Sequence, residues 1–258
     1  MANTLRLDGT ATPARSYKRP PAVETVIELK YRTPIDEQTI KKVAKKFRPH
    51  YPRSERQTGV EYRVDIKTGK IDTVPEWHGL KLASEDAADV LFIRTMGFSH
   101  IRLAPYLGWN RFIDGATRNW VTAIGVIGRR AISRVGLRYM NRLDVPVQKD
   151  KELKIEDYLR IIPITIEFGL KWDPISTYLV HFTRSLGVDG FFVNVSTGTT
   201  DSPLVNHRSL LLDIDVYSDG LNLLKDSDIW NLAAKMRTYK NDIFEATVTD
   251  NARALFET

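Results

Sequence analysis

A long alternating stretch, AISRVGLRYMNRLDVP, occupies residues 131–146. Successive side chains of an extended chain point to opposite faces, so Val135, Leu137, Tyr139 and Leu143 share one face. The opposite face carries three arginines together with glycine and methionine. The pattern therefore predicts one long strand with an apolar face and a cationic face.

Shorter alternating runs on both sides of this stretch predict further strands. They lie at 21–31, 59–66, 78–86, 89–96 and 99–106 before it, and near 163–168, 175–184, 190–197 and 208–217 after it. Two prolines mark the start of the first strand, because proline cannot donate a hydrogen bond to a central ladder.

Apolar residues three or four positions apart predict helices among these strands. The first predicted helix starts at Thr33, a favourable N-cap that Pro34 follows, and it ends at Pro49. A second helix is predicted at 107–128 and a long third helix at roughly 227–245. A short fourth helix, capped by Thr249, follows.

The strands occur in runs and not in strict alternation with helices, which favours an α+β fold with antiparallel sheets. A run of strands ends in a helix twice along the chain, so we predict two similar halves, each an antiparallel sheet covered by a helix. The charged connector VQKDKELKIEDY (147–158) lies between them. The predicted domains are an N-terminal tail at 1–20, an N-terminal half at 21–148 and a C-terminal half at 160–258.

The tail at 1–20 is polar and shows no periodicity, which is typical of a segment without structure of its own. Where such a tail is ordered, contact with another molecule is the simplest cause. We therefore expect a neighbouring subunit or a partner protein to hold it.

The composition indicates a folded globular protein. Of 258 residues, 42% are hydrophobic and 27% are charged, which excludes a collagen-like or mainly disordered chain. The chain contains no cysteine, so disulfides, thiolate metal sites and a cysteine nucleophile are excluded. No uncharged run approaches the roughly 18 residues of a membrane helix, and the N-terminus lacks the apolar stretch of a secretory signal. We therefore expect a cytoplasmic protein.

The basic charge is concentrated in the first quarter of the chain. The formal net charge is +6 and the isoelectric point is about 9.4. Residues 1–60 carry 13 lysines and arginines against 6 acidic residues, whereas residues 61–258 carry 25 against 26. This asymmetry predicts an anionic partner for the N-terminal region.

The densest group of these cations lies on the outer face of the first predicted helix and just after it. Its members are Lys41, Lys42, Lys45, Lys46, Arg48, Arg53 and Arg56. Cations at this density neutralise phosphates, and Tyr51 among them offers a ring on which a base can stack. The two open interpretations are a nucleic-acid or anion-binding surface and a solvated lysine face of an ordinary helix.

Two aspartates form the sharpest candidate for chemistry. Asp213 and Asp215 are two positions apart on a predicted strand, so their carboxylates share one face and are suited to bind Mg²⁺ or to act in acid–base catalysis. The long strand offers a matching row of cations, Arg134, Arg138 and Arg142. We favour a structural charge network, a cross-strand ladder of salt bridges, over a metal site.

Familiar catalytic and cofactor motifs are missing from the sequence, which contains no GxxxxGKS/T, GxGxxG, HExxH or GxSxG. The five histidines are widely scattered, and none has a partner at metal-ligand spacing. We interpret them as structural or surface residues. The sequence therefore predicts no catalytic residue, no metal and no cofactor.

Several segments together resemble a bacterial protein family. They are RVGLRYMNRL (134–143), LLLDIDVYSDG (210–220), KNDIFEATVTDNARALF (240–256), RPPAVETVIELKY and SHIRLAPYLGWNRF. The family that they resemble is a sporadically distributed group of uncharacterised bacterial proteins of about this length, and the resemblance extends from about Pro20 to Phe256. No activity is established for that family, so the resemblance implies no catalytic residue. Patchy distribution is typical of mobile defence and toxin–antitoxin genes, and the resemblance implies such a setting.

We predict a non-enzymatic interaction or assembly subunit, forming a homo-oligomer or binding a protein partner, in a bacterial antiviral defence or toxin–antitoxin module and without a membrane. The missing catalytic motifs and the concentrated basic region support this hypothesis. Two alternatives stay open. One is a nucleic-acid-binding protein that uses residues 41–56, and the other is a Mg²⁺-dependent enzyme built on Asp213 and Asp215.

Overall fold

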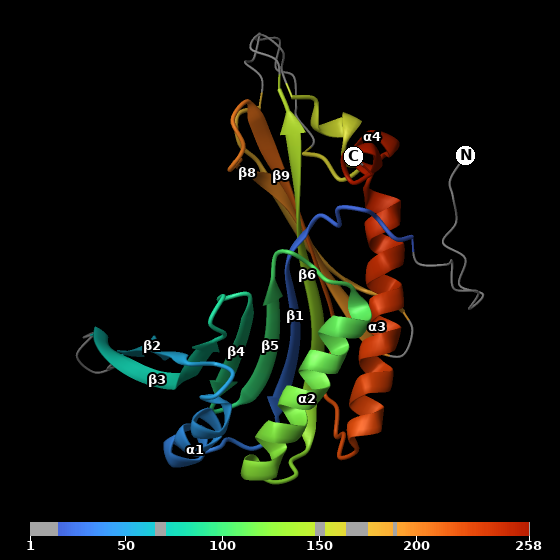
Figure 1. Ribbon diagram of the computed structural model, residues 1–258. Coiled ribbons are helices and arrows are strands. Elements are labelled where there is room, and N and C mark those ends of the chain that lie inside the picture. Colours follow the sequence, from blue (N-terminus) through green and yellow to red (C-terminus); the bar gives the residue numbers. More distant parts are fainter. Residues whose placement is uncertain (1–14, 65–70, 148–152, 164–174, 188–189, 258) are drawn as a thin grey trace. The chain divides into compact units, whose positions relative to one another are not determined.

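The strand predicted at 131–146 is β6 (Ile132–Pro146) of a nine-stranded sheet in the computed structural model (Figure 1). From Val135 to Val145 the odd-numbered side chains are buried, and the even-numbered ones, apart from Gly136, are partly exposed. This alternation confirms the predicted apolar face of the strand.

The structure describes residues 15–64, 71–147, 153–163, 175–187 and 190–257, and for 59–64 and 71–76 it describes the backbone only. Two predictions fall mostly outside these ranges: the strand near 163–168 and residues 1–14 of the tail. No helix within the described ranges is long and apolar enough to cross a membrane.

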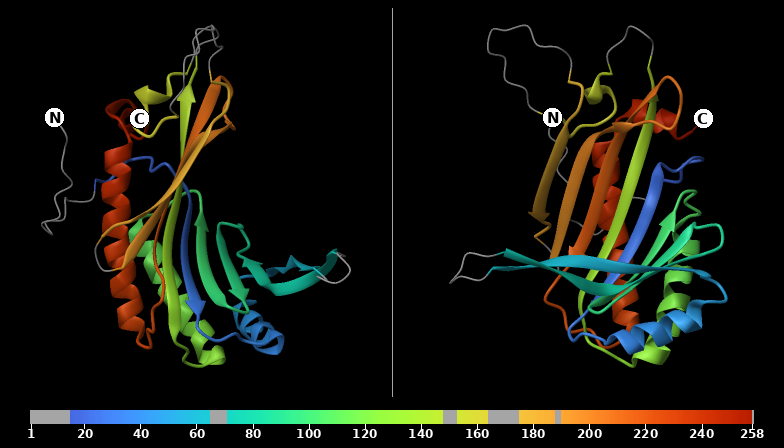
Figure 2. Two further views of the ribbon diagram at one scale, coloured as in Figure 1. Left: turned by 180° about the vertical axis from the view of Figure 1, so that it is seen from behind. Right: turned by 90° about the vertical axis from the view of Figure 1, so that its left-hand side faces the viewer.

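The strand order of the sheet is β2-β3-β4-β5-β1-β6-β9-β8-β7. The other strands are β1 (Ala22–Tyr31), β2 (Arg53–Val64), β3 (Ile71–Ala83), β4 (Asp89–Arg94), β5 (Gly97–Leu103), β7 (Leu179–Ser185), β8 (Phe191–Asp201) and β9 (His207–Ser218). Neighbouring strands pair antiparallel from β2 through β5 to β1, and so do β7 and β8. The pair β2–β3 projects beyond β4 (Figure 2). Together with the helices, this sheet confirms the predicted α+β class.

Four α-helices and one 3₁₀ turn accompany the sheet. They are α1 (Glu37–Phe47), α2 (Trp109–Ile127), η1 (Ile155–Asp157), α3 (Asp226–Thr247) and α4 (Asp250–Leu255). Thr249 caps α4 as predicted, since its Oγ1 accepts a hydrogen bond from Ala252 N at 3.3 Å. All four predicted α-helices are therefore present.

The start of α1 differs from the prediction. The N-cap is Asp36, whose Oδ1 accepts a hydrogen bond from Thr39 N at 2.6 Å. Thr33, the predicted cap, instead accepts a hydrogen bond at Oγ1 from Arg130, which also donates to the carbonyl of Pro34. A partner distant in the sequence thus holds these residues outside the helix, and the better-placed carboxylate caps it.

The chain forms two compact units, each assembled from separate segments. The α2 unit comprises residues 23–138 and 217–233, and the α4 unit comprises 1–22, 139–216 and 234–258. The division passes through β6, β9 and α3 and not through the connector at 147–158. The linear domains predicted at 21–148 and 160–258 therefore do not correspond to these units, because β6 is a single unbroken strand that contributes to both.

Residues of the same chain hold the described part of the N-terminal tail. Tyr17 Oη donates a hydrogen bond to Glu245 at 2.7 Å, and its ring contacts Phe256 edge-on with centroids 5.2 Å apart. The backbone N–H of Arg19 donates to the carbonyl of Phe256 at 2.9 Å. A second chain is thus not needed to order this part of the tail, contrary to our expectation.

Helix α1 positions Tyr51, a residue of the candidate site. Its apolar side chains Ile40, Val43 and Phe47 are buried, and the helix packs against α2, β3 and β4. Just after α1, the backbone N–H of Tyr51 donates to the carbonyl of Phe47 at 2.8 Å. The Tyr51 ring lies edge-on to Phe47, with centroids 5.7 Å apart, and this contact fixes its direction toward α2.

Candidate anion-binding pocket

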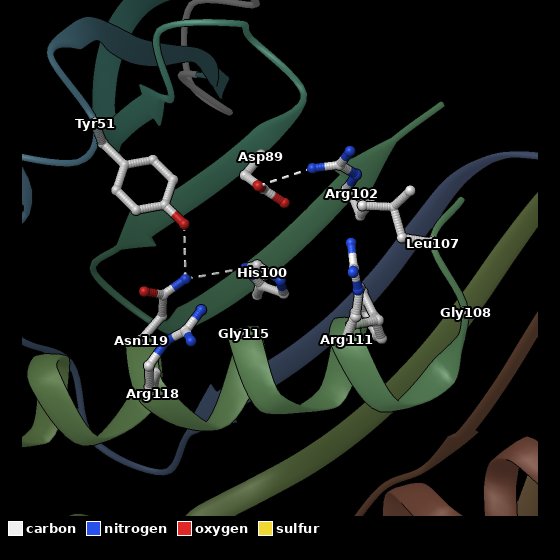
Figure 3. A pocket seen from close by; sticks show the side chains of 11 residues that line it. Tyr51, Asp89, His100, Arg102, Leu107, Gly108, Arg111, Gly115, Arg118 and Asn119 are labelled. Atoms are coloured by element: carbon white, nitrogen blue, oxygen red, sulfur yellow. Dashed lines mark hydrogen bonds and ion pairs between the residues drawn. The ribbon is translucent and has the colours of Figure 1, made fainter. Parts of the chain in front are cut away.

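The α2 unit contains a pocket of about 110 Å³ between α2 and the strands β4 and β5 (Figure 3). It is lined by Tyr51, Asp89, His100, Arg102, Leu107, Gly108, Arg111, Phe112, Gly115, Arg118 and Asn119. Three arginines and a histidine converge on it, together with a single carboxylate, Asp89. The site is therefore strongly cationic.

Local geometry explains why these side chains meet. His100 and Arg102 are two positions apart on β5, so they point to the same face of the sheet. Arg111, Gly115 and Arg118 are four and three positions apart on α2, so they share one face of the helix. Packing α2 on β5 brings the two rows together.

His100 lies at the inner wall of the pocket and is 3% exposed. A Cβ added to Gly115 would stand 3.2 Å from His100 Nε2, so the glycine leaves room for the ring. Asn119 Nδ2 lies 2.7 Å from Tyr51 Oη and 3.2 Å from His100 Nδ1. An amide donor at Nδ1 makes that nitrogen the acceptor and places the ring proton on Nε2.

The Nε2 atom of His100 is a donor without a described partner. Among the described residues it makes no hydrogen bond, and the ring's other neighbour is Phe112, with centroids 5.3 Å apart. Burial, with smaller contributions from Arg102 and Arg118, lowers the pKa of His100 to about 4. At neutral pH the ring is therefore uncharged and offers one N–H.

The three arginines differ in their surroundings. Arg102 is mostly buried and forms an ion pair with Asp89, with Nη1 2.9 Å from Oδ2. Arg111 and Arg118 are exposed, and neither guanidinium group has a hydrogen bond or ion pair with a described residue. Two uncompensated positive charges thus border the mouth of the pocket, as Figure 3 shows.

This arrangement is suited to an oxyanion. Guanidinium groups bind phosphate, sulfate and carboxylate through paired N–H donors, and a neutral imidazole N–H adds a further donor at low desolvation cost. Asp86 is another carboxylate near the site. Hydrogen bonds that it accepts from Ser84 and Ala88 within its own turn lower its pKa, and the charge of Arg102 has a smaller effect. This carboxylate is not among the lining residues.

The basic face predicted on the first helix is present on α1, but its two ends differ. Lys41 Nζ lies 2.8 Å from Glu37. Hydrogen bonds from Thr39 lower the pKa of Asp36, and the nearby charge of Lys42 adds a smaller effect. Lys45, Lys46 and Arg48 are exposed and have no ion pair with a described residue. The uncompensated cations therefore gather at the end of α1 that leads to Tyr51.

The remaining members of that predicted group lie on β2. Arg53 and Arg56 are exposed, and β2 begins at Arg53, before the stretch 59–66 in which we predicted it. The Lys41 hydrogen bond, with a smaller effect of Arg56, lowers the pKa of Glu37. The fold thus brings Arg56 beside the first turn of α1.

The suggested role of Tyr51 as a stacking platform is wrong. Its side chain is 8% exposed, with the ring against Phe47, so a base cannot reach its face. The hydroxyl instead accepts from Asn119 and lines the pocket. Burial raises the pKa of Tyr51 to about 12, so this hydroxyl stays protonated.

The structural charge network predicted around the long strand has additional members. Arg134 Nε lies 3.3 Å from Glu28 and Nη1 lies 3.3 Å from Asp219, and its guanidinium covers the Tyr217 ring at 4.0 Å. Glu28 also pairs with Arg94 at 3.5 Å. Arg134 thus forms ion pairs with carboxylates that the sequence pattern did not identify.

The other members of the predicted network are also engaged. Arg142 pairs with Asp144 at 3.0 Å, and Asp215 accepts a hydrogen bond from Asn194 at 3.2 Å. Arg138 and Asp213 have partners as well. A direct ladder between the three arginines and the two aspartates stays a prediction. No three His, Asp or Glu side chains in the described part of the chain lie close enough together to hold a metal ion.

Sequence reasoning missed the pocket because its residues come from four separate segments. The sequence placed His100 and Arg102 on one face of a strand, but nothing in it linked them to Arg111 and Arg118. The signal that was available is the spacing of Arg111, Gly115 and Arg118, a small residue between two cations on one helix face.

No family model matches the chain, and no curated protein matches it.

The Glu28–Arg134 pair gives a stability prediction. Glu28→Gln should lower the free energy of unfolding by about 1–2 kcal/mol, because it leaves the partly buried Arg134 and Arg94 without one shared carboxylate. The matched control is Glu24→Gln on the same strand, which should change it by less than about 0.5 kcal/mol. Urea denaturation measures both, and equal effects of the two substitutions would contradict the network.

His100 gives a pH prediction. Its pKa of about 4 lies below that of an exposed histidine, so the unfolded chain binds the proton more readily. Protonation of His100 therefore does not affect the free energy of unfolding above about pH 6.5. As the pH falls from there toward 4, the unfolded chain takes up the proton first, and the free energy of unfolding decreases by roughly 3 kcal/mol in total.

Urea denaturation of His100→Gln between pH 7.5 and 4 should give a shallower loss of stability than the native chain shows. His50→Gln, at an exposed position, serves as the control and should follow the native curve. Parallel curves for His100→Gln and the native chain would show that the ring is not buried in its neutral form.

Proposed function

We propose that this protein is a non-enzymatic binding protein whose pocket recognises the phosphate group of an anionic ligand. The observation that carries the proposal is the pair of unpartnered guanidinium groups, Arg111 and Arg118, beside the buried N–H of His100. Such groups are stable at a surface without partners, yet their convergence on one small pocket concentrates positive potential there. Phosphate, with several oxygens and up to two charges, matches this set of donors better than a carboxylate does.

The single carboxylate of the pocket supports binding and not acid–base chemistry. Asp89 is held by Arg102 at 2.9 Å, so this carboxylate is already engaged in an ion pair. His100 is a weak base for the same purpose, since its pKa is about 4. Asp89 also fixes the position of Arg102, which leaves the other two arginines to contact the ligand.

Isothermal titration with inorganic phosphate and pyrophosphate at low salt tests the proposal. Arg111→Ala and Arg118→Ala should each weaken binding by about tenfold, because each removes a charge-assisted hydrogen bond. Arg129→Ala, outside the pocket, is the control and should leave the affinity unchanged. Absence of binding by the native chain at low salt, or equal weakening by all three variants, would overturn the proposal.

An assembly role is the second candidate, and an edge strand favours it. Among the described residues β7 is the last strand in the sheet order, and Leu179 on it is 76% exposed. An open edge with an apolar side chain invites pairing with a strand of another chain. This supports the predicted homo-oligomer or protein partner, and the antiviral defence or toxin–antitoxin setting remains part of that proposal.

Sedimentation velocity tests self-assembly through β7. The native chain should associate at micromolar concentration, and Leu179→Lys should remain monomeric, because a charged edge resists strand pairing. Leu224→Lys, at another exposed leucine, is the control and should associate as the native chain does. A native chain that stays monomeric across this range would exclude self-assembly through this edge.

The prediction of two similar halves also remains a proposal. Each predicted half combines antiparallel strands with a helix: β4 and β5 with α2 in residues 21–148, and β7 and β8 with α3 in residues 160–258. This shared content supports a distant duplication.

A further inference from the structure

The size of the pocket limits how much of a ligand it holds. Its volume of about 110 Å³ is well below the roughly 300–1,000 Å³ of pockets that enclose a drug-sized molecule. A phosphate group with a few waters fits this space, whereas a whole nucleotide does not. If the proposed function holds, the rest of the ligand therefore lies outside, on the surface around the mouth.

The basic end of α1 leads along the chain to Tyr51, which lines the pocket. Arg48 is three positions before Tyr51, so the two Cα atoms are at most about 11 Å apart. Lys45 and Lys46 lie in the last turn of α1, one turn before Arg48. Phosphates of one strand recur about every 3.4 Å along the axis of a DNA duplex, so about four successive phosphates span this distance.

Apart from Asp114, which lies one turn from both Arg111 and Arg118 on α2, the acidic residues near this route are already engaged or lie at its other end. Asp89 is bound to Arg102, and Glu37 and Asp36 face the first turn of α1, where they offset Lys41 and Lys42. Asp114, exposed on α2, does not line the pocket. The uncompensated cations thus form a group from Arg111 and Arg118 to Lys45, Lys46 and Arg48.

We propose that the pocket holds the terminal phosphate of a nucleic-acid strand and that the following phosphates of that strand lie along the basic end of α1. This inference rests on the proposed function and names its ligand. A terminal phosphate ends the chain and carries up to two charges, so it can enter a small pocket. A phosphodiester carries one charge and continues in both directions, which requires an open groove.

Fluorescence anisotropy with labelled single-stranded oligonucleotides tests this inference. The arms are DNA and RNA of one sequence with a 5′-phosphate, a 3′-phosphate or two hydroxyl ends, and a blunt duplex. We expect one phosphorylated end to bind about tenfold or more tighter than the hydroxyl-ended strand. The combined variant Arg111→Ala/Arg118→Ala should lose this preference while it keeps weak binding to all strands.

The basic end of α1 should behave differently. The triple variant Lys45→Gln/Lys46→Gln/Arg48→Gln should weaken binding of phosphorylated and hydroxyl-ended strands alike. It should also reduce the slope of log affinity against log salt by about 2. Lys41→Gln, on the same helix but paired with Glu37, is the matched control and should change the slope little. All these side chains are exposed, and thermal unfolding checks that the variants remain folded.

The outcomes separate this inference from the proposed function. If inorganic phosphate binds in the pocket but phosphorylated and hydroxyl ends bind equally, the terminal-phosphate inference is wrong and the proposed function stands. If the end preference survives Arg111→Ala/Arg118→Ala, the pocket is not the site of the terminal phosphate. If inorganic phosphate and every oligonucleotide fail to bind, both proposals are wrong.

Discussion

The buried row along β6 is the constraint on which the rest of the structure depends. Six odd-numbered side chains from Val135 to Val145 are removed from water, and among them Asn141 satisfies its amide by donating to the carbonyl of Leu212 at 3.0 Å. A shift of one residue would turn this row to the other face and expose it, so the register of the central strand is strongly determined. Because β6 contributes to both compact units, each unit is built around part of one strand.

The pocket is a consequence of a second close packing, that of α2 on β5. Gly115 lets the helix approach His100, and the resulting desolvation keeps the ring neutral while Asn119 orients it. The buried ring of His100 on β5 supplies one hydrogen-bond donor, and the exposed Arg111 and Arg118 on one face of α2 supply positive charge. Together they form a positively charged recess with several donors. The single carboxylate there is already used by Arg102, so the positive charge of the recess remains.

Local patterns predicted the helices and most of the strands, placed the starts of β2 and β3 too late, and predicted side-chain partners poorly. The alternation at 131–146 and the stripe at 107–128 correspond to β6 and α2 within a residue or two. The cap of α1 was misplaced because Arg130, far along the chain, holds Thr33 and Pro34 outside the helix. Tyr51 was misjudged for a related reason: its neighbours in sequence are basic and exposed, whereas its neighbours in space are Phe47 and Asn119.

The sequence by itself determined the α+β class, the elements and the basic character of the N-terminal quarter, because these follow from periodicity and composition within short stretches. The pairing of Lys41 with Glu37 follows from their spacing of four residues on one helix, which the sequence shows. Tertiary structure alone decided which cations meet across the fold, because Arg111 and Arg118 become neighbours of His100 only when α2 lies on β5. Electrostatic potential depends on distances through space, and the fold sets those distances.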